Sequence, residues 1–394
     1  MKSPQRSSSK DNQLLSIKEI ARFRGSVKQQ VCVEMLEEGF HRSFSELFSL
    51  MRLDCERRAL ADPSSLLRVH TPLEEQPDKL QVLREHLSRS ELAERTASRS
   101  VACDQRQLLA QFFSSTEDSW LSVHFYHSCA ERGGSRAATE AQACLAELYL
   151  QQGDLQRSLQ QAELCVGQAD DGGALRRRGE LLLIRTLTQM AKSLLDQKQH
   201  NEALTLLRRA HDIATDIGEK QMEGEASCLL GVAYQSAGNR DMANQFFNSC
   251  LQTYNTLQDA DGLVRANLAR AESLQRQGLI EETIQCLEEL IKMCQSNAMQ
   301  DKLADVCLCL GVLYYNKGQH RSADEQLLQS YEAAAFSGDV LLQQKAQVMV
   351  GCARAHLLLG PFSEVVASTS GAALRRLLRW KERRRRPDDS AELC

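Results

Sequence analysis

A 40-residue period governs the second half of this chain. Glycines recur at positions 238, 278 and 318, and the segment LGVAY at 230–234 returns 80 residues later as LGVLY at 310–314. Self-similarity with a period of 20 to 50 residues is the signature of a repeat protein, in which each unit packs only on its neighbours. The 394 residues therefore need no single large globular core.

Each unit has the content of a helical hairpin. A first helix carries Leu-Gly-x-x-Tyr and a second carries Ala-x-x-x-Phe, which is the pattern of the tetratricopeptide repeat. A small residue at Gly231 lets neighbouring helices approach closely, a large one at Phe247 fills the remaining space, and Gly238 ends the first helix in a left-handed conformation. The positions assigned to this packing are Gly231, Tyr234, Ala243, Phe247, Gly311, Tyr314 and Ala323.

Composition agrees with a helical fold, since there are 6 prolines and Leu, Ala, Gln, Glu and Arg dominate. We predict an all-α solenoid of tetratricopeptide-like hairpins, with repeats of about 40 residues in a right-handed superhelix and a helical N-terminal region. The expected parts are a disordered tail at 1–13, the helical region at 14–132, about six hairpins at 138–380, and a basic then polar tail at 381–394. The hairpins are expected at 138–170, 179–216, 221–258, 261–297, 299–336 and 341–380. The sequence leaves open whether the first third is a cap or a set of degenerate repeats.

The 14 cysteines indicate a reducing compartment. Residues Cys228, Cys250, Cys286 and Cys307 lie within apolar helical stripes, where cysteine acts as a small hydrophobic residue. The first 16 residues are polar and charged rather than a secretory signal, so we expect reduced thiols and a cytoplasmic protein. No uncharged apolar run approaches the roughly 18–20 residues needed to cross a bilayer, and we expect no membrane partner.

Motifs for catalysis are missing from the sequence. It contains no G-x-x-x-x-G-K-[ST], G-x-S-x-G or H-E-x-x-H pattern. The nearest approach to a metal site is His124, His127 and Cys129, which lack an evident fourth ligand, while Cys307 and Cys309 point to opposite sides of a helix. We therefore expect that the chain is not an enzyme and that it has no cofactor and no metal site. We predict that it is a protein-binding scaffold.

Solenoids of this kind usually bind partners on the concave surface lined by the first helices. By repeat position, the candidates for that surface are Gln235, Arg265, Glu272, Asp305 and Tyr315. Chaperone-binding repeats use Lys, Asn and Arg on successive first helices to hold a peptide carboxylate. The corresponding positions here are apolar, so a co-chaperone role is not expected: Cys228, Val232, Leu268, Leu308 and Val312.

Charge is uneven along the chain. The formal net charge is −4, yet residues 375–386 carry eight Lys or Arg against the single acid Glu382. This run is compatible with an acidic partner, tubulin's acidic tails, nucleic acid or an import receptor. The interpretation we favour is a solvated helix end whose cations suit the helix dipole, so nucleic acid is not an expected partner.

Two segments of the first third are more distinctive than the repeats. Residues 27–51, VKQQVCVEMLEEGFHRSFSELFSLM, and residues 72–80, PLEEQPDKL, resemble the tetratricopeptide repeat protein 29 family, and the similarity continues to about residue 385. The resemblance implies a component of the axoneme in cilia and the sperm flagellum. It would act in assembly and beating with dynein, intraflagellar-transport or tubulin-associated proteins, in the cytoplasm and cytoskeleton. The alternative is a cytoplasmic adaptor for cargo or signalling complexes. No catalytic or ligand residues carry over from the family.

Overall fold

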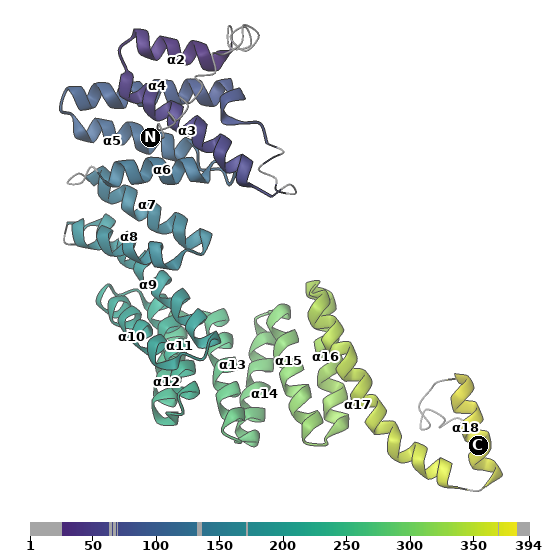
Figure 1. Cartoon of the computed structure of the whole chain (residues 1–394). Helices are drawn as coiled ribbons and strands as arrows, with labels where there is room; N and C mark the ends of the chain where they lie inside the picture. The colour runs from purple at the N-terminus through teal and green to yellow at the C-terminus, as the bar shows by residue number, and fades with distance from the viewer. Residues whose placement is uncertain are drawn as a thin grey trace, which may run out of the picture. The chain divides into compact units, whose positions relative to one another are not determined.

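The computed structural model describes residues 26–62, 65, 68, 70–131, 136–170, 172–368 and 370–383. Within these ranges the regular structure is helical and no strand is present, which confirms the predicted all-α fold (Figure 1). No described helix is both long enough and apolar enough to cross a membrane. Residues 1–186 and 187–394 form two compact units. The expected tail at 1–13 lies outside the described residues, as does 384–394.

The first unit consists of successive helices, and those from α2 to α7 share one apolar core. Its apolar centre includes Met35, Leu47, Leu83, Phe113 and Phe125, all fully buried. The helices are α2 (Val27–Glu37), α3 (His41–Leu60), the 3-10 turn η2 (Leu73–Glu75), α4 (Pro77–Arg95), α5 (Arg99–Phe112), α6 (Ser119–Ala130), α7 (Arg136–Gln152), α8 (Leu155–Gln168) and the start of α9 (Ala174–Asp196).

The second unit contains the 40-residue repeats. Successive helices pair along the chain, and the pairs at 220–257, 260–296 and 300–337 occur where the glycine period predicts hairpins (Figure 1). The helices after the end of α9 are α10 (His200–Asp216), α11 (Lys220–Ser236), α12 (Arg240–Leu257), α13 (Ala260–Arg276), α14 (Ile280–Ser296), α15 (Gln300–Asn316), α16 (His320–Ser337), α17 (Val340–Ala367) and α18 (Gly371–Arg383).

A small residue facing a large one fixes each hairpin. A Cβ atom added at Gly231 would lie 2.7 Å from the ring of Phe247, and one added at Gly311 would lie 2.6 Å from Leu327. The turn between the two helices uses Gly238 at φ +85°, a conformation that costs an L-residue about 1–2 kcal/mol. These contacts explain why the period is visible in the sequence.

The last repeat departs from the prediction. The sequence predicts a hairpin at 341–380, but α17 continues through Gly360 and Pro361 to Ala367, and α18 begins only at Gly371. The position equivalent to Gly318 is Leu358, which cannot end a helix in the left-handed conformation cheaply. The missing glycine therefore lets three successive leucines, 357–359, extend the helix instead of closing it.

The same repeat leaves uncovered the face on which a second helix packs in the other hairpins. Gly351 occupies the position of Gly231 and Gly311, yet nothing lies within 4 Å of a Cβ added there. On the same side of α17, Gln344 and Gln347 are exposed together with Val340. The glutamines suit a face that no further hairpin covers within the described residues.

Candidate protein-binding surface

The side chains of α11, α13, α15 and α17 that are exposed or half-buried on the side away from the paired second helix form what we call the first-helix surface. Burial of one side of each helix determines which residues reach this surface. In α11, for example, Leu230, Ala233 and Tyr234 are buried, whereas Gln235 and Cys228 remain half-buried. Repeat symmetry places equivalent positions of successive first helices in the same row.

One row of this surface alternates in charge. Glu225, Arg265, Asp305 and Lys345 are 40 residues apart and carry negative, positive, negative and positive side chains. Burial raises the pKa of Asp305, and the nearby cations Lys302 and Lys345 oppose that effect. A row that neutralises itself offers no concentrated positive charge for a peptide carboxylate.

Flanking ion pairs strengthen this neutralisation. Lys192 Nζ lies 2.8 Å from Glu225 Oε1, and Lys302 Nζ lies 3.9 Å from Asp261 Oδ1. Arg265 Nε lies 3.3 Å from Asp261 Oδ2, so one aspartate serves two cations. Exposed ion pairs of this kind contribute little to the free energy of unfolding. Their main effect is on the distribution of surface charge to which a binding partner must be complementary.

Beside the charged row runs an apolar one. Cys228, Leu268 and Leu308 are half-buried and Val348 is exposed, all at one repeat position. A hydrogen bond with Cys250 lowers the pKa of the Cys228 thiol, and Arg265 acts in the same direction. Cys228, Leu268 and Leu308 also pack against the buried clusters beneath them, so Val348 is the most accessible member of this row. A carboxylate clamp would need cations at these positions.

An aromatic cluster lies at the end of the surface. The Tyr315 ring is 5.4 Å from the rings of both His320 and His356, and the two imidazoles stack at 4.6 Å with an interplanar angle of 15°. The Tyr315 ring meets both imidazoles edge-on, at 65° and 77°, and aromatic side chains of this kind are enriched in protein interfaces.

The five residues predicted from the sequence are distributed over this surface rather than gathered in one site. Gln235 accepts a 3.4 Å hydrogen bond from Gln277 Nε2, and Glu272 lies 3.9 Å from Arg276. Glu272 and Asp305 both act on one residue, the Cys309 thiol. Partial burial raises the pKa of this thiol, and the two carboxylates raise it further. Among the described residues no hydrogen bond or ion pair joins one of the five to another: Gln235, Arg265, Glu272, Asp305 and Tyr315.

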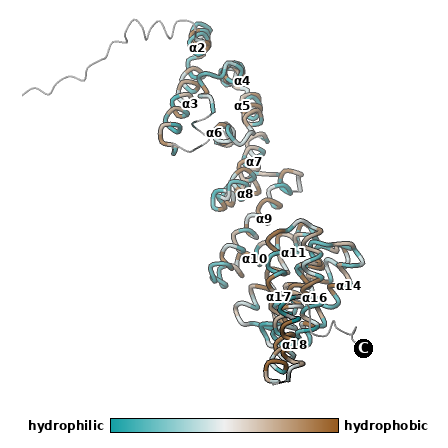
Figure 2. Tube along the Cα trace, turned by 90° about the vertical axis from the view of Figure 1, so that its right-hand side faces the viewer, coloured by the Kyte–Doolittle hydropathy of each residue, from teal (hydrophilic) through white to brown (hydrophobic). Residues whose placement is uncertain are grey.

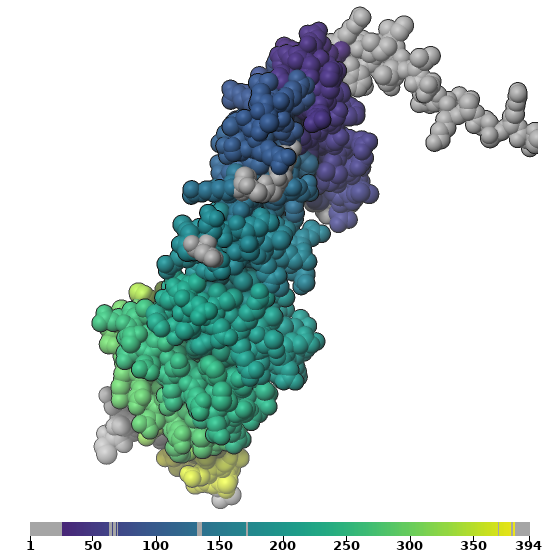
Figure 3. Space-filling model, turned by 90° about the vertical axis from the view of Figure 1, so that its left-hand side faces the viewer, coloured from purple at the N-terminus to yellow at the C-terminus, as the bar shows by residue number. Residues whose placement is uncertain are grey.

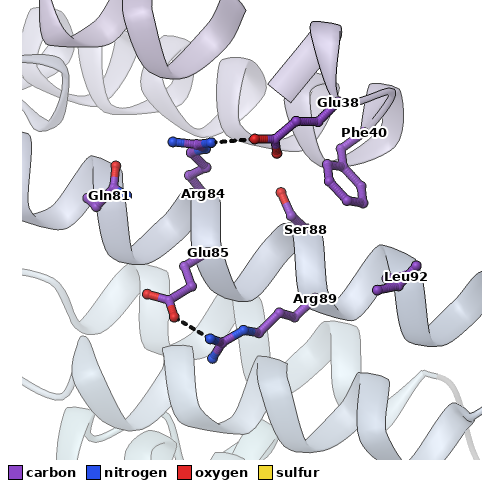
Figure 4. A pocket seen from close by; sticks show the side chains of 8 residues that line it. All are labelled: Glu38, Phe40, Gln81, Arg84, Glu85, Ser88, Arg89 and Leu92. Carbon is purple, nitrogen blue, oxygen red and sulfur yellow. Dashed lines mark hydrogen bonds and ion pairs between the residues drawn. The ribbon is translucent and has the colours of Figure 1, made fainter. Parts of the chain in front are cut away.

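A pocket in the first unit was not predicted from the sequence. It has a volume of about 320 Å³ and lies between the α2–α3 turn and α4, where the Ser88 hydroxyl is buried without a hydrogen-bond partner (Figure 4). Arg84 Nη2 lies 2.7 Å from Glu38 Oε1 at one side, and Arg89 pairs with Glu85 at 2.5 Å. Its lining residues are Glu38, Phe40, Gln81, Arg84, Glu85, Ser88, Arg89 and Leu92. No sequence motif marks this pocket, because its two walls are more than 40 residues apart in the chain.

The residues weighed as metal ligands have other partners. His124 Nε2 lies 3.1 Å from Glu46 Oε1, His127 Nε2 lies 2.7 Å from the Tyr149 hydroxyl, and Cys129 Sγ lies 3.8 Å from the carbonyl oxygen of Cys103. Over the described part of the chain, no group of three or more His, Cys, Asp or Glu side chains is arranged to hold a metal ion. Cys307 is buried and Cys309 exposed, on different sides of α15.

Comparison with known proteins points to one group. A family model for the tetratricopeptide repeat matches residues 182–256. Tetratricopeptide repeat protein 29 of Macaca fascicularis is 31% identical over 94% of this chain and 81% of its own length, and the Homo sapiens protein of that name is 32% identical over the same shares. Among solved structures, the apo form of RapI aligns with a TM-score of 0.43 at 9% identity, covering 65% of this chain and 98% of that one.

Proposed function

The chain belongs to the tetratricopeptide repeat protein 29 family, and from this membership we propose that it is a non-enzymatic scaffold of the axoneme. It is a protein-binding repeat protein, as the repeat match and the family indicate. The finer proposal is that it acts in the assembly and beating of cilia or the sperm flagellum. Its proposed partners are dynein, intraflagellar-transport or tubulin-associated proteins.

The observation that carries this proposal is the extent of the family similarity, which covers 94% of the chain at 31% identity and so includes the N-terminal unit as well as the generic repeats. The first-helix surface supports the binding part. It combines an apolar row with a row of alternating charges and an aromatic cluster, features that select one partner by pattern rather than by net charge.

Location tests the proposal directly. The tagged chain is imaged in motile ciliated cells before and after detergent extraction of soluble protein. Signal retained along the axoneme is the expected result. Complete loss on extraction would overturn the axonemal proposal and favour the cytoplasmic adaptor, while leaving the repeat fold unaffected.

A charge-swapped variant tests whether the first-helix surface makes the contact. Arg265→Asp combined with Asp305→Arg keeps the net charge but reverses the order of two exposed members of the row. We expect the variant to lose most of its axonemal signal while its melting temperature changes little. The matched control, Glu289→Lys with Lys292→Glu, makes the same exchange on the exposed side of α14 and should retain the signal. Equal retention of both variants would exclude this surface.

A further inference from the structure

The distal part of α17 and the whole of α18 extend away from the other helices of the second unit (Figure 1). In Figure 3 the surface of this C-terminal segment is visible at the lower edge of the second unit. The tube is hydrophobic at the end of this extension (Figure 2). Leu359 and Val366 share one side of α17 and are both more than half exposed. The polar end of the solenoid at Gln344 and Gln347 lies earlier in the same helix, so the exposed apolar residues are not part of that cap.

Helix α18 packs on α17 with one side and leaves another side open. Ala373 is 6% exposed and Leu377 is half-buried, and α17 is the neighbouring helix. Leu374 and Leu378 are 59% and 52% exposed, and their i, i+4 spacing places them one above the other. The open side of α18 is therefore an apolar ridge of two leucines.

Cations border this ridge. At 100° per residue, Arg375 and Arg379 follow one edge of the ridge, where Glu382 also lies, and Lys381 lies beyond the other edge. The margins of the ridge therefore carry these three cations against one acid. None of these three has an ion-pair partner in the described part of the chain, in contrast to the paired charges of the first-helix surface. An apolar ridge between unpaired cations matches a surface that is apolar at its centre and acidic at its margins.

We propose that α18 is a docking site for an acidic amphipathic helix of another protein. Leu374 and Leu378 insert between apolar side chains of that helix, while Arg375, Arg379 and Lys381 pair with its carboxylates. This contact is separate from the first-helix surface and does not depend on an axonemal location. It differs from the solvated helix end favoured by the sequence, because the exposed leucines are unexplained by solvation.

Two other classes of partner fit the surface less well. A helix that lies in a membrane interface needs one wide apolar face, whereas part of the apolar side of α18 is used against α17 and two leucines remain. A nucleic-acid backbone would attract the cations but offers no counterpart for Leu374 and Leu378.

The test uses the full chain and a synthetic peptide. The peptide is a helix with leucines at i, i+4 spacing and glutamates on either side, and its control has the same composition in scrambled order. Binding is followed by fluorescence anisotropy, with polyglutamate, anionic lipid vesicles and duplex DNA as further probes. We expect the patterned peptide to bind at least about tenfold more tightly than the scrambled peptide or polyglutamate.

Variants separate the two parts of the site. Leu374→Ser with Leu378→Ser, and separately Arg375→Glu with Arg379→Glu, should each weaken peptide binding by about tenfold or more. Leu279→Ser, at an exposed leucine preceding α14, should leave binding unchanged. Thermal melting confirms that each variant is folded.

Several results would overturn the proposal. These are failure to bind the patterned peptide, equal binding of both peptides, and tighter binding to vesicles or DNA. Dimerisation that disappears in the Leu374→Ser, Leu378→Ser variant would assign the site to a second copy of the chain instead.

Discussion

Glu46 and Arg106 form a bidentate ion pair in the interior of the first unit. Arg106 Nη1 and Nη2 donate to the two carboxylate oxygens of Glu46 at 2.7 and 2.8 Å, and Arg106 is 6% exposed. His124 Nε2 lies 3.1 Å from the same carboxylate. One side chain of α3 therefore joins α5 and α6. Such a pair makes the unit sensitive to loss of either partner.

Acid should weaken the first unit through Glu46. Burial alone would raise the pKa of Glu46, but hydrogen bonds from His124 and Arg106 lower it to about 2. Because the folded pKa lies below the unfolded value, the stabilisation is complete above about pH 5 and is lost as pH falls toward 2. We expect a loss of roughly 3 kcal/mol over this range, measured by urea unfolding with Trp120 fluorescence in a Trp380→Phe background.

The control for this prediction is Glu46→Gln. The amide leaves the buried guanidinium without its counter-charge, so the variant should be less stable at neutral pH by about 3 kcal/mol or more. Its stability should then fall less steeply between pH 5 and pH 2 than that of the wild type. Parallel pH curves for the two proteins would show that Glu46 does not carry the acid sensitivity.

Gly231 and Gly351 should respond differently to the same substitution, although they occupy one repeat position. Gly231→Leu drives a side chain into Phe247 and should cost roughly 1–3 kcal/mol. Gly351→Leu meets nothing within 4 Å and should be neutral or stabilising by up to about 1 kcal/mol, since leucine favours helix more than glycine does. Thermal melting measures the stability of both variants. An equal loss of stability would mean that a second helix packs on Gly351 as α12 packs on Gly231.

The central repeats could be predicted from the sequence because their constraints are local. A glycine is needed at Gly238 for the turn and at Gly231 for the approach of Phe247, and both needs recur every 40 residues. The last repeat was mispredicted because Gly360 stands two residues after the expected turn position. At the expected turn, Leu358 could take the left-handed conformation only at a cost of about 1–2 kcal/mol, a strain that Lys198 does bear in its own repeat.

The contacts of the first unit could not be predicted in the same way. Glu46 and Arg106 are 60 residues apart, and the walls of the pocket around Ser88 come from two separate helices. Neither the ion pair nor the pocket recurs along the chain, so the periodicity of the sequence does not predict them. For the first-helix surface, the sequence predicted which helices carry candidate residues, but the pairing of Arg265 with Asp261 depends on side-chain geometry that periodicity does not contain.

Thiol reactivity should follow burial along the chain. Cys307 is fully buried, and burial together with Cys294 raises its pKa to about 12, whereas Cys55 is exposed. Because the thiolate is the reactive form, iodoacetamide at pH 8 should label Cys55 more than tenfold faster than Cys307 in the folded protein. Peptide mass spectrometry measures both sites in one digest, and denaturation should largely abolish the difference. Comparable labelling before denaturation would contradict the burial of Cys307.

Lys198 stands where the later repeats have a turn glycine, and replacing it should stabilise the protein. Its φ is +63°, in the region occupied by Gly238, Gly278 and Gly318, and a residue with a Cβ is strained there. Lys198→Gly removes that strain but increases the freedom of the unfolded chain, so the expected net gain is about 0.5–1 kcal/mol.

Two controls make the Lys198→Gly prediction specific to the backbone. Glu289→Gly, in the middle of α14 at normal helical geometry, should cost about 1 kcal/mol, because glycine lacks helix propensity. The reverse exchange, Gly238→Lys, should also destabilise, since it introduces the strain that Lys198 already bears. The melting temperatures of the three variants show directly whether each substitution stabilises or destabilises the protein. A destabilised Lys198→Gly variant would mean that contacts of the lysine side chain outweigh the strain of its backbone at this turn.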